Sequence, residues 1–301
     1  MFYFFEKKMM IAITGASGLV GSYMAEKLQA EKISVRALSR QPRRSASGTE
    51  WIEGDLDDRQ ALELLIRGAE AVIHCAGLVS FTASAKKLNK INAIGTGHVV
   101  DACLTFGTPL LYISSVAALE GQSYLSPYGH SKMLGEMEVY RGREEGLKAA
   151  IVAPSIVLAP TDKGEGRHLL RYLKRGLPFY FDGNINFVDA RDVADLAFEI
   201  IKQKKYDKWT AHAETMSWKN FMEEGSLRLN TRKPSIKLPN AVLQIGGLFN
   251  EARAFIARQE PGLSYRSAKL AAAENTFDSS KIKELGFKFR SRKETLDWYF
   301  A

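Results

Sequence analysis

Cysteine is scarce in this chain of 301 residues, and long apolar runs are missing from it. The two cysteines, Cys75 and Cys103, lie in separate apolar stretches, with no CxxC pair and no spacing typical of metal ligands. These absences argue against a disulfide scaffold and against a zinc site, so no metal is expected. No apolar run approaches the roughly 20 residues that a membrane-spanning helix needs.

The N-terminus also lacks the features of a targeting segment. Its apolar residues at 2–5 precede the charged residues at 6–8, and the stretch is too short to span a bilayer. We expect neither a signal peptide nor an anchor, and we expect residues 1–9 to form a disordered extension. The prediction is a cytoplasmic protein without a membrane partner.

Excess charge of one sign is modest. Lys and Arg number 42 against 34 Asp and Glu, and the basic residues occur in short groups with no stripe of arginines interleaved with aromatics. This pattern is typical of a solvated, mildly basic surface, so no nucleic-acid partner is expected. Hydrophobic residues make up 46% of the chain and charged residues 25%, which is an ordinary globular mixture.

What the first half does contain is a regular alternation of short apolar strands and amphipathic helices. Strands are expected at 11–14, 34–39, 71–75, 110–113 and 149–153, and helices at 19–30, 59–67, 85–106 and 127–145. This order is typical of βαβ units with right-handed crossovers. The sequence therefore predicts an α/β fold with a doubly wound parallel sheet of the Rossmann type.

The second half is less regular and predicts a smaller substrate domain, interleaved with the first. We expect a dinucleotide-binding domain at 10–160 and a substrate-binding region at 161–301. The segment 185–204 has the pattern of a strand and a helix that return to the main sheet.

A glycine-rich turn joins the first strand to the first helix. Gly15, Gly18 and Gly21 are spaced GxxGxxG. Glycine at such a junction permits a tight turn and a close approach of the backbone to a pyrophosphate, and the helix N-terminus favours the anion. An ordinary strand-to-helix turn also uses glycine, but this position favours dinucleotide binding. The expected contacts are Gly15, Ser17, Gly18, Leu19 and Val20.

The end of the second strand lacks the Asp or Glu that would bind free ribose hydroxyls. Arg40 stands there instead, placed for a charge-assisted contact with a 2′-phosphate. NADP(H) is therefore expected in preference to NAD(H). After the next short strand, Asp55 and Leu56 are expected to bracket the adenine, although Asp55 could equally cap the following helix.

Seven pieces of the sequence, in the same order, resemble the extended short-chain dehydrogenase/reductases, the NAD-dependent epimerase/dehydratase family. They are TGASGLVG (14–21), GDL (54–56), VIHCAG (72–77), NAIGT (92–96), ISS (113–115), YGHSK (128–132) and FVDARDV (187–193). The resemblance covers the chain from residue 10 onward and is strongest to the dihydroflavonol-reductase-like branch. Ala153-Pro154 stands where nucleotide-sugar epimerases usually have Arg-Pro, which weakens the case for a sugar-nucleotide substrate.

The resemblance implies that Tyr128 and Lys132 are catalytic and that Ser115, rather than Ser114, polarises the substrate oxygen. It places the cofactor across the C-terminal edge of the sheet, with Lys132 also on the nicotinamide ribose. Further cofactor contacts are expected at Ala76, Gly77, Ile113, Pro154 and Ile156. Phe81 and Phe187 are assigned to the substrate pocket, with burial in the core as the alternative, and His74 is expected to be a core residue.

The spacing of Tyr128 and Lys132 has a chemical reason of its own. Residues four apart share one face of a helix. An ordinary tyrosine has a pKa of about 10, and a nearby cation lowers that pKa and lets the phenol exchange a proton near neutrality. Pro127 fits the first turn of that helix. A phenol so activated could protonate a carbonyl oxygen as hydride arrives.

The sequence thus predicts an NADP(H)-dependent oxidoreductase that reduces the carbonyl of a small organic substrate. One alternative is a nucleotide-sugar epimerase or dehydratase that recycles a tightly held NAD(P). Another is a non-catalytic NADP(H)-binding redox sensor, although relatives of that kind tend to lose the tyrosine and the lysine. A homodimer is expected from family precedent alone.

Overall fold

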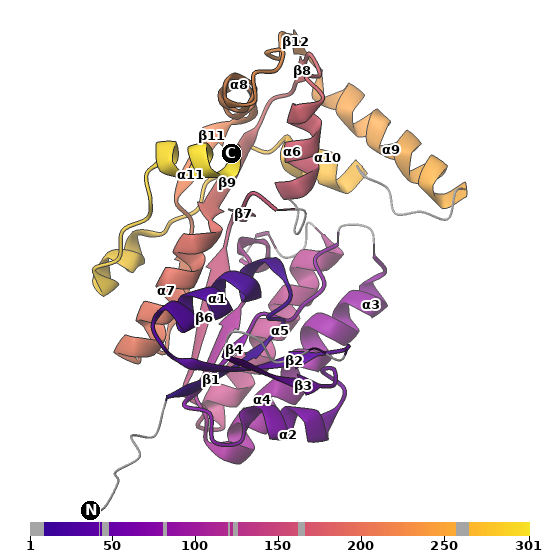
Figure 1. The fold of residues 1–301 in the computed structure, drawn as a ribbon. Helices are drawn as coiled ribbons and strands as arrows, with labels where there is room; N and C mark the ends of the chain where they lie inside the picture. The colour runs from indigo at the N-terminus through magenta and orange to yellow at the C-terminus, as the bar shows by residue number, and fades with distance from the viewer. Residues whose placement is uncertain are drawn as a thin grey trace, which may run out of the picture.

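The structure is a computed structural model that describes most of the chain (Figure 1). The described residues are 9–41, 43, 48–80, 83–119, 121–122, 126–161, 166–256 and 265–301. Residues 1–8 of the predicted extension, and Phe81 of the predicted substrate pocket, lie outside them.

A seven-stranded parallel sheet forms the centre of the molecule, in the order β10-β6-β5-β4-β1-β2-β3. The strands are β1 (Met10–Thr14), β2 (Ser34–Ser39), β3 (Thr49–Glu53), β4 (Ala71–His74), β5 (Leu110–Ile113), β6 (Ala149–Pro154) and β10 (Lys208–Ala211). The chain order reverses between β1 and β4, and a ligand crevice is expected at that point, beyond the carboxyl ends of the strands. The predicted fold class is confirmed.

Helices cover both faces of this sheet. One face carries α1 (Leu19–Ala30) and α7 (Ala190–Gln203), and the other carries α2 (Arg59–Ile66), α4 (Gly95–Phe106) and α5 (Pro127–Glu144) (Figure 1). Successive side chains of a strand point to opposite faces. In β1, Ile11 and Ile13 accordingly pack with α1 and α7, whereas Ala12 packs with α2 and α4. Burial on both faces explains why these strands are apolar throughout.

The helix expected at 85–106 is continuous in the chain but changes its winding. It consists of α3 (Ala85–Asn89), a π-helical turn, η1 (Lys90–Ile94), and α4. Such turns are frequent at functional sites. Its central residue, Asn92, is 1% exposed and belongs to the site described below.

The strand expected at 185–189 does not join the main sheet, so this part of the prediction is wrong. It is β9 (Asn184–Asp189) of a separate three-stranded sheet, where it pairs parallel with β7 (Ile156–Leu158) and antiparallel with β11 (Glu214–Ser217). Its residues Ile185 and Phe187 pack in a third core cluster with α8 (Trp218–Arg228) and α11 (Arg292–Tyr299), whereas Val188 belongs to the cluster of α1 and α7. The helix that follows, α7, does pack on α1, and β10 is the strand that returns to the main sheet.

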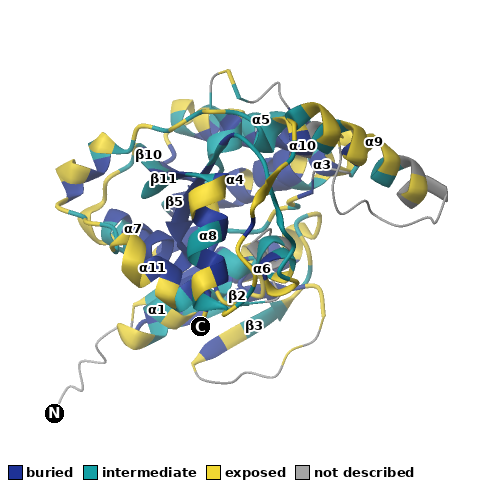
Figure 2. Cartoon of the chain, turned by 90° about the horizontal axis from the view of Figure 1, so that it is seen from above, coloured by how far each residue is buried: buried dark blue, intermediate teal, exposed yellow. Residues whose placement is uncertain are grey.

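The remaining elements lie beyond the carboxyl edge of the main sheet (Figure 1). They are α6 (Gly166–Lys174), β8 (Phe179–Tyr180), β12 (Ile236–Lys237), α9 (Asn240–Ile256) and α10 (Tyr265–Ala271). The short helix η4 (Ser280–Leu285) instead packs beside β10 and belongs to the core cluster of α1 and α7. Buried residues concentrate around β5 and its neighbouring helices, whereas α9 extends outward and is largely exposed (Figure 2).

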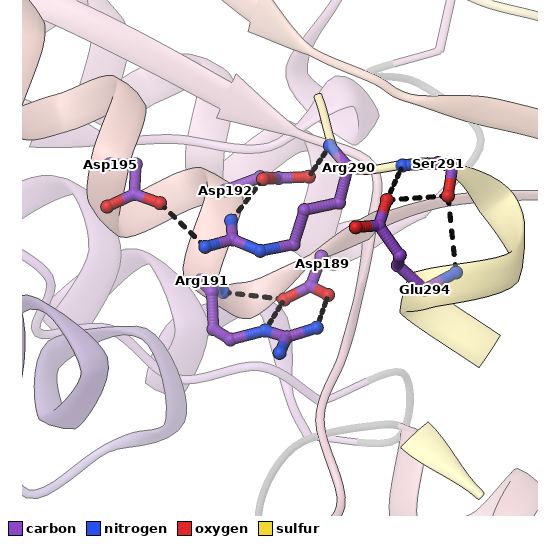
Figure 3. A network of polar contacts seen from close by, with 7 residues as sticks. All are labelled: Asp189, Arg191, Asp192, Asp195, Arg290, Ser291 and Glu294. Carbon is purple, nitrogen blue, oxygen red and sulfur yellow. Dashed lines mark hydrogen bonds and ion pairs between the residues drawn. The ribbon is translucent and has the colours of Figure 1, made fainter. Parts of the chain in front are cut away.

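A polar network ties the C-terminal segment to α7 (Figure 3). The Arg290 guanidinium pairs with Asp192 and with Asp195, and the Arg290 amide donates to Asp192 Oδ2 at 3.0 Å. Beside it, Arg191 Nη2 lies 2.6 Å from Oδ2 of the fully buried Asp189. Burial raises the pKa of Asp192 to about 6, a shift that its contacts with Arg290 partly oppose. The carboxylate of Asp192 is therefore stable in the core only because Arg290 is its partner.

Replacing Arg290 with Met is expected to destabilise the fold by about 3 kcal/mol at neutral pH, because it leaves the Asp192 carboxylate buried without a counter-ion. Asp192 binds its proton more tightly in the folded than in the unfolded chain, with a pKa of about 6 against 3.8. The unfolded value is the same in both proteins, and without Arg290 the folded pKa rises further, so the loss should shrink as pH falls from that higher value toward about 6. Urea unfolding of wild type and variant across this pH range measures it.

Arg228→Met is the matched control, because its partners Glu224 and Asp297 are 40% and 44% exposed. It should cost under about 1 kcal/mol at every pH. A loss for Arg290→Met that is equally small, or that grows as pH falls, would contradict the assignment.

Candidate active site

The turn between β1 and α1 has a geometry that requires glycine. Gly15 has φ of +72°, and a Cβ added there would lie 2.5 Å from the backbone nitrogen of Ala76. A Cβ on Gly21 would lie 2.1 Å from the Gly15 oxygen. At the N-cap of α1, Gly18 offers no side chain to the first-turn amides, and that turn carries no acidic residue. These amides are thus available for a phosphate, as dinucleotide binding needs.

A cavity of about 540 Å³ opens beside this turn, at the carboxyl ends of β1 to β4. Eight of the predicted cofactor residues line it: Gly15, Ser17, Gly18, Arg40, Asp55, Leu56, Ala76 and Gly77. The residues come from four strands that the sheet order brings together. The glycine cradle and the position at the switch point both fit the phosphate and adenosine portions of a dinucleotide.

The structure distinguishes the two predicted roles of Asp55, a contact with the adenine and a cap of the following helix. Asp58, not Asp55, caps α2, since its Oδ1 accepts from the Ala61 amide at 3.0 Å. Asp55 instead accepts from the Asp57 amide at 2.8 Å and faces the cavity. The capping alternative is therefore wrong.

The arginines after β2 differ in their surroundings. Arg40 is exposed and lines the cavity. Arg43 lies over the ring of Trp51, with its guanidinium 5.0 Å from the ring centre, and its Nε donates to Ser39 Oγ at 3.2 Å. Arg44 lies outside the described residues. Arg40 is thus the described arginine of this segment that lines the cavity.

Part of the cavity wall is not among the residues predicted from the sequence. Lys87, Lys90 and Ile91 line it from α3 and η1. Their i, i+3 and i+4 spacing puts them on one helix face, and this pattern could have identified them. Lys90 is 2.8 Å from Asp57, so the wall carries both signs of charge.

The first turn of α5 packs tightly against the segment that follows β5. Pro127 occupies the start of the helix, and Ser126 Oγ caps it by accepting from the Gly129 amide at 3.0 Å. A Cβ on Gly129 would lie 2.4 Å from the oxygen of Ala117. Ser115 is two residues before Ala117 and caps the short helix η2 (Val116–Ala118). The close packing therefore brings the turn that carries Tyr128 next to Ser115.

Lys132 lies between α5 and β5, beside a residue that lines the cavity. Its Nζ donates to the oxygen of Ile113 at 2.8 Å and lies 4.3 Å from the ring centre of Tyr112. A Cβ on Gly77, which lines the cavity, would be 3.7 Å from the same Nζ. Burial lowers the pKa of Lys132 to about 7, while the charge of Glu136 opposes the shift. Tyr128, one turn earlier, is 7% exposed.

Asn92 holds the neighbouring loop and helix together. Its side chain accepts from the Leu78 amide at 2.7 Å and donates to the Leu78 oxygen at 2.9 Å. It also donates to Ser131 Oγ at 2.9 Å, and Ser131 in turn donates to the Tyr128 oxygen at 2.8 Å. The π-helical turn thus positions the backbone at Tyr128.

His74 is a core residue, as expected. It is fully buried, Nδ1 is 2.6 Å from Thr14 Oγ1, and Nε2 is 3.0 Å from Thr96 Oγ1. Burial lowers the pKa of His74 to about 3, so the ring is neutral at physiological pH.

Other predicted site residues lie away from the cavity lining. Pro154 ends β6, and Ile156, which begins β7, is 36% exposed. Phe187 is 1% exposed in the core cluster, with its ring centre 5.7 Å from that of Phe221, a position that favours the core alternative. Leu19 and Val20 are half-buried in the first turn of α1.

Lys132→Met is expected to stabilise the protein at neutral pH by on the order of 2 kcal/mol, because the buried ammonium costs more than its contacts return. The pKa of Lys132 is about 7 in the folded chain against 10.5 ordinarily. The unfolded chain thus holds more protons between these values, and wild-type stability rises with pH there. The gain should be largest below pH 7 and vanish above 10.5. Thermal melts across this range test it.

Lys219→Met, on the exposed surface of α8, is the control, and its effect should not depend on pH in this way. A loss of stability for Lys132→Met at neutral pH would refute the account of a strained buried ammonium.

Comparison with known proteins agrees with this geometry. Residues 11–210 match the model of the NAD dependent epimerase/dehydratase family. A Synechocystis protein named "Putative dihydroflavonol 4-reductase" is 28% identical, over 94% of this chain and 91% of its own. The crystal structure of gox2253 superposes with a TM-score of 0.80 at 26% identity, over 98% of this chain and 97% of that one. The NAD complex of Thermus thermophilus UDP-glucose 4-epimerase has a TM-score of 0.74 at 18% identity, over 97% and 98%, which shows the shared fold.

Within the described part of the chain, no helix combines the length and apolarity that crossing a membrane would require. In the same residues, no cluster of three or more His, Cys, Asp or Glu side chains could bind a metal ion. Because the residues that match the family model include most of the main sheet and the glycine-rich turn, the chain belongs to the NAD-dependent epimerase/dehydratase family and is an NAD(P)-dependent enzyme of the extended short-chain dehydrogenase/reductase type.

Proposed function

We propose that this protein is an NADP(H)-dependent reductase that reduces the carbonyl of a small organic substrate, with Tyr128 as the proton donor. The observation that carries the proposal is the position of Lys132, whose Nζ lies beside Gly77 of the cavity and one helical turn from Tyr128. A single buried cation there can contact the cofactor and act on the phenol. The reductase name of the Synechocystis relative supports the same direction of chemistry.

Each residue of the proposed site has its own role in the reaction. Bound NADPH would supply hydride to the carbonyl carbon, and negative charge then develops on the carbonyl oxygen. Tyr128 donates its phenolic proton to that oxygen, and Lys132 stabilises the phenolate that remains. Ser115, held next to the first turn of α5, donates a hydrogen bond to the same oxygen. Asn92 and Ser131 fix the backbone at Tyr128 while this proton moves.

The preference for NADP(H) rests on Arg40. The strand β2 ends in Ser39 rather than an acidic residue, and Arg40 is exposed at the cavity wall. Lys87 and Lys90 add positive charge to the same cavity, against the carboxylates of Asp55 and Asp57. A 2′-phosphate would meet the guanidinium of Arg40 in a charge-assisted contact.

The same proposal extends to the location, the substrate class and the assembly of the enzyme. We infer a cytoplasmic enzyme, where NADPH is available as a reductant, acting on a small molecule and forming a homodimer. Cross-linking and light scattering of the purified protein test the dimer.

The central experiment is a screen of aldehydes and ketones that follows the absorbance of NADPH. Net consumption of NADPH with at least one carbonyl compound supports the reductase. A protein that retains NAD(P) through purification, interconverts nucleotide sugars and consumes no net cofactor would instead be an epimerase. Binding of NADPH without any turnover would favour the redox sensor.

Tyr128→Phe is expected to lower kcat by at least about 1000-fold, since removing the hydroxyl removes the proton donor. The affinity for NADPH, measured by fluorescence titration, should stay within about twofold, because Lys132 and the glycine turn remain. Tyr140→Phe, on an exposed turn of the same helix, is the control and should keep full activity. Full activity of Tyr128→Phe would refute the proposed mechanism.

Arg40→Asp is expected to shift the ratio of kcat/KM for NADPH to that for NADH by at least about 100-fold toward NADH. Loss of the guanidinium removes the phosphate contact, and the carboxylate can accept from free ribose hydroxyls. Arg59→Asp makes the same change of charge on the exposed start of α2, outside the cavity, and should leave the ratio unchanged. If both variants behave alike, Arg40 does not select the cofactor.

A further inference from the structure

A buried carboxylate lies one helical turn beyond Lys132 in α5. Glu136 is 3% exposed. Its Oε1 accepts from Ser114 Oγ at 2.6 Å, and its Oε2 is 2.5 Å from Lys208 Nζ of β10. A carboxylate in such a place is costly unless it is paired and hydrogen-bonded, and an apolar side chain could fill the same volume. The two polar partners, Ser114 and Lys208, therefore indicate that Glu136 has a role beyond filling the core.

The contacts of Glu136 extend those of Lys132 along β5. Lys132 bonds to the oxygen of Ile113, Glu136 to the hydroxyl of the next residue, Ser114, and the residue after that is Ser115. Two successive turns of α5 are thus fastened to two successive residues at the carboxyl end of β5. These two contacts determine the position of Ser115 relative to Tyr128.

Glu136 also supplies charge to Lys132. Among the described residues, the other titratable groups near the ammonium are His74 and Cys75 of the β4 end, Tyr112 of β5, and Tyr128 one turn earlier on α5. Burial holds His74 and Cys75 in their neutral forms and raises the pKa of Tyr112. From η1, the uncharged amide of Asn92 approaches the same Gly77 position as the Lys132 ammonium. The negative charge acting on Lys132 comes from Glu136, which is itself balanced by Lys208.

We propose that Glu136, together with Lys208, is a positioning residue of the reaction centre, which fixes Ser114 and thereby Ser115 against α5 and keeps Lys132 in its charged form. This rests on the proposed function only in that Tyr128 and Lys132 transfer the proton. Lys208 limits the effect of Glu136, because it neutralises part of the same carboxylate.

The direct test is the titration of Lys132 in ¹⁵N-lysine-labelled protein by NMR, with the Lys132→Met spectrum to assign its signal. Glu136→Gln keeps the volume and removes the charge, so the pKa of Lys132 should fall by about one unit. Lys208→Met leaves the Glu136 charge uncompensated, so the pKa of Lys132 should rise. The two shifts have opposite signs, which a merely structural role would not produce. Shifts of the same sign, or no shift in either variant, would overturn the proposal.

Activity provides a second readout, with a carbonyl compound found in the screen. In Glu136→Gln, kcat should fall at least about tenfold, KM for NADPH should stay within about twofold, and the basic limb of the pH profile should move to lower pH. Glu136→Asp restores the charge, and it should return that limb toward the wild-type position. Ser114→Ala removes the hydrogen bond and keeps the charge, so kcat should fall without a shift of the limb.

Each proposal can fail by itself. If Glu136→Gln does not fold, the Lys208→Met titration and the Ser114→Ala profile still decide the matter. The NMR titration needs neither substrate nor cofactor, so absence of carbonyl reduction would refute the proposed function and leave the titration result intact. Full kcat in Ser114→Ala together with an unmoved Lys132 titration in Lys208→Met would overturn the role of Glu136.

Discussion

The arrangement of the proposed reaction centre depends on a buried ammonium ion held at the carboxyl end of β5. Lys132 is 5% exposed and is bonded to the main-chain oxygen of Ile113, at the point where α5 crosses the sheet edge. An ion in this place lacks hydration, which lowers its pKa to about 7. The surrounding groups must therefore stabilise the positive charge of Lys132.

The packing of α5 shows how that arrangement is made. The close approach of Gly129 to Ala117 and the bond from Ser114 to Glu136 bring the helix against the segment after β5. On its other side, Asn92 in a π-helical turn joins the loop after β4 to Ser131. Each contact alone contributes modestly to stability. Together they leave Tyr128 few alternative positions.

The main sheet, which carries the cavity, and the three-stranded sheet are linked by the C-terminal segment. The chain leaves the main sheet after β6, forms β7 and β9 of the three-stranded sheet, returns as α7 and β10, and then completes the smaller sheet with β11. Arg290 then fastens the final segment to α7, and Trp298 of α11 packs edge-on to Tyr23 of α1, with ring centres 5.6 Å apart. Segments far apart in sequence therefore support the helix that follows the glycine turn.

The sequence by itself determined the order of strands and helices in the first half, the glycine turn, and the pairing of Tyr128 with Lys132. These features are local: a strand shows as an apolar run, a tight turn as glycine, and a shared helix face as a spacing of four. Even so, local pattern left Asp55 with two roles, and the N-cap of α2 went to Asp58 because of its own hydrogen bond.

Only the tertiary structure decided which sheet the strand at 185–189 joins, since an apolar strand pairs equally well with either edge in sequence terms. The same holds for Lys87 and Lys90 at the cavity and for Glu136 at the end of β5. Their roles depend on contacts between residues more than 20 apart in the chain, and such contacts follow from the packing of whole elements rather than from local pattern.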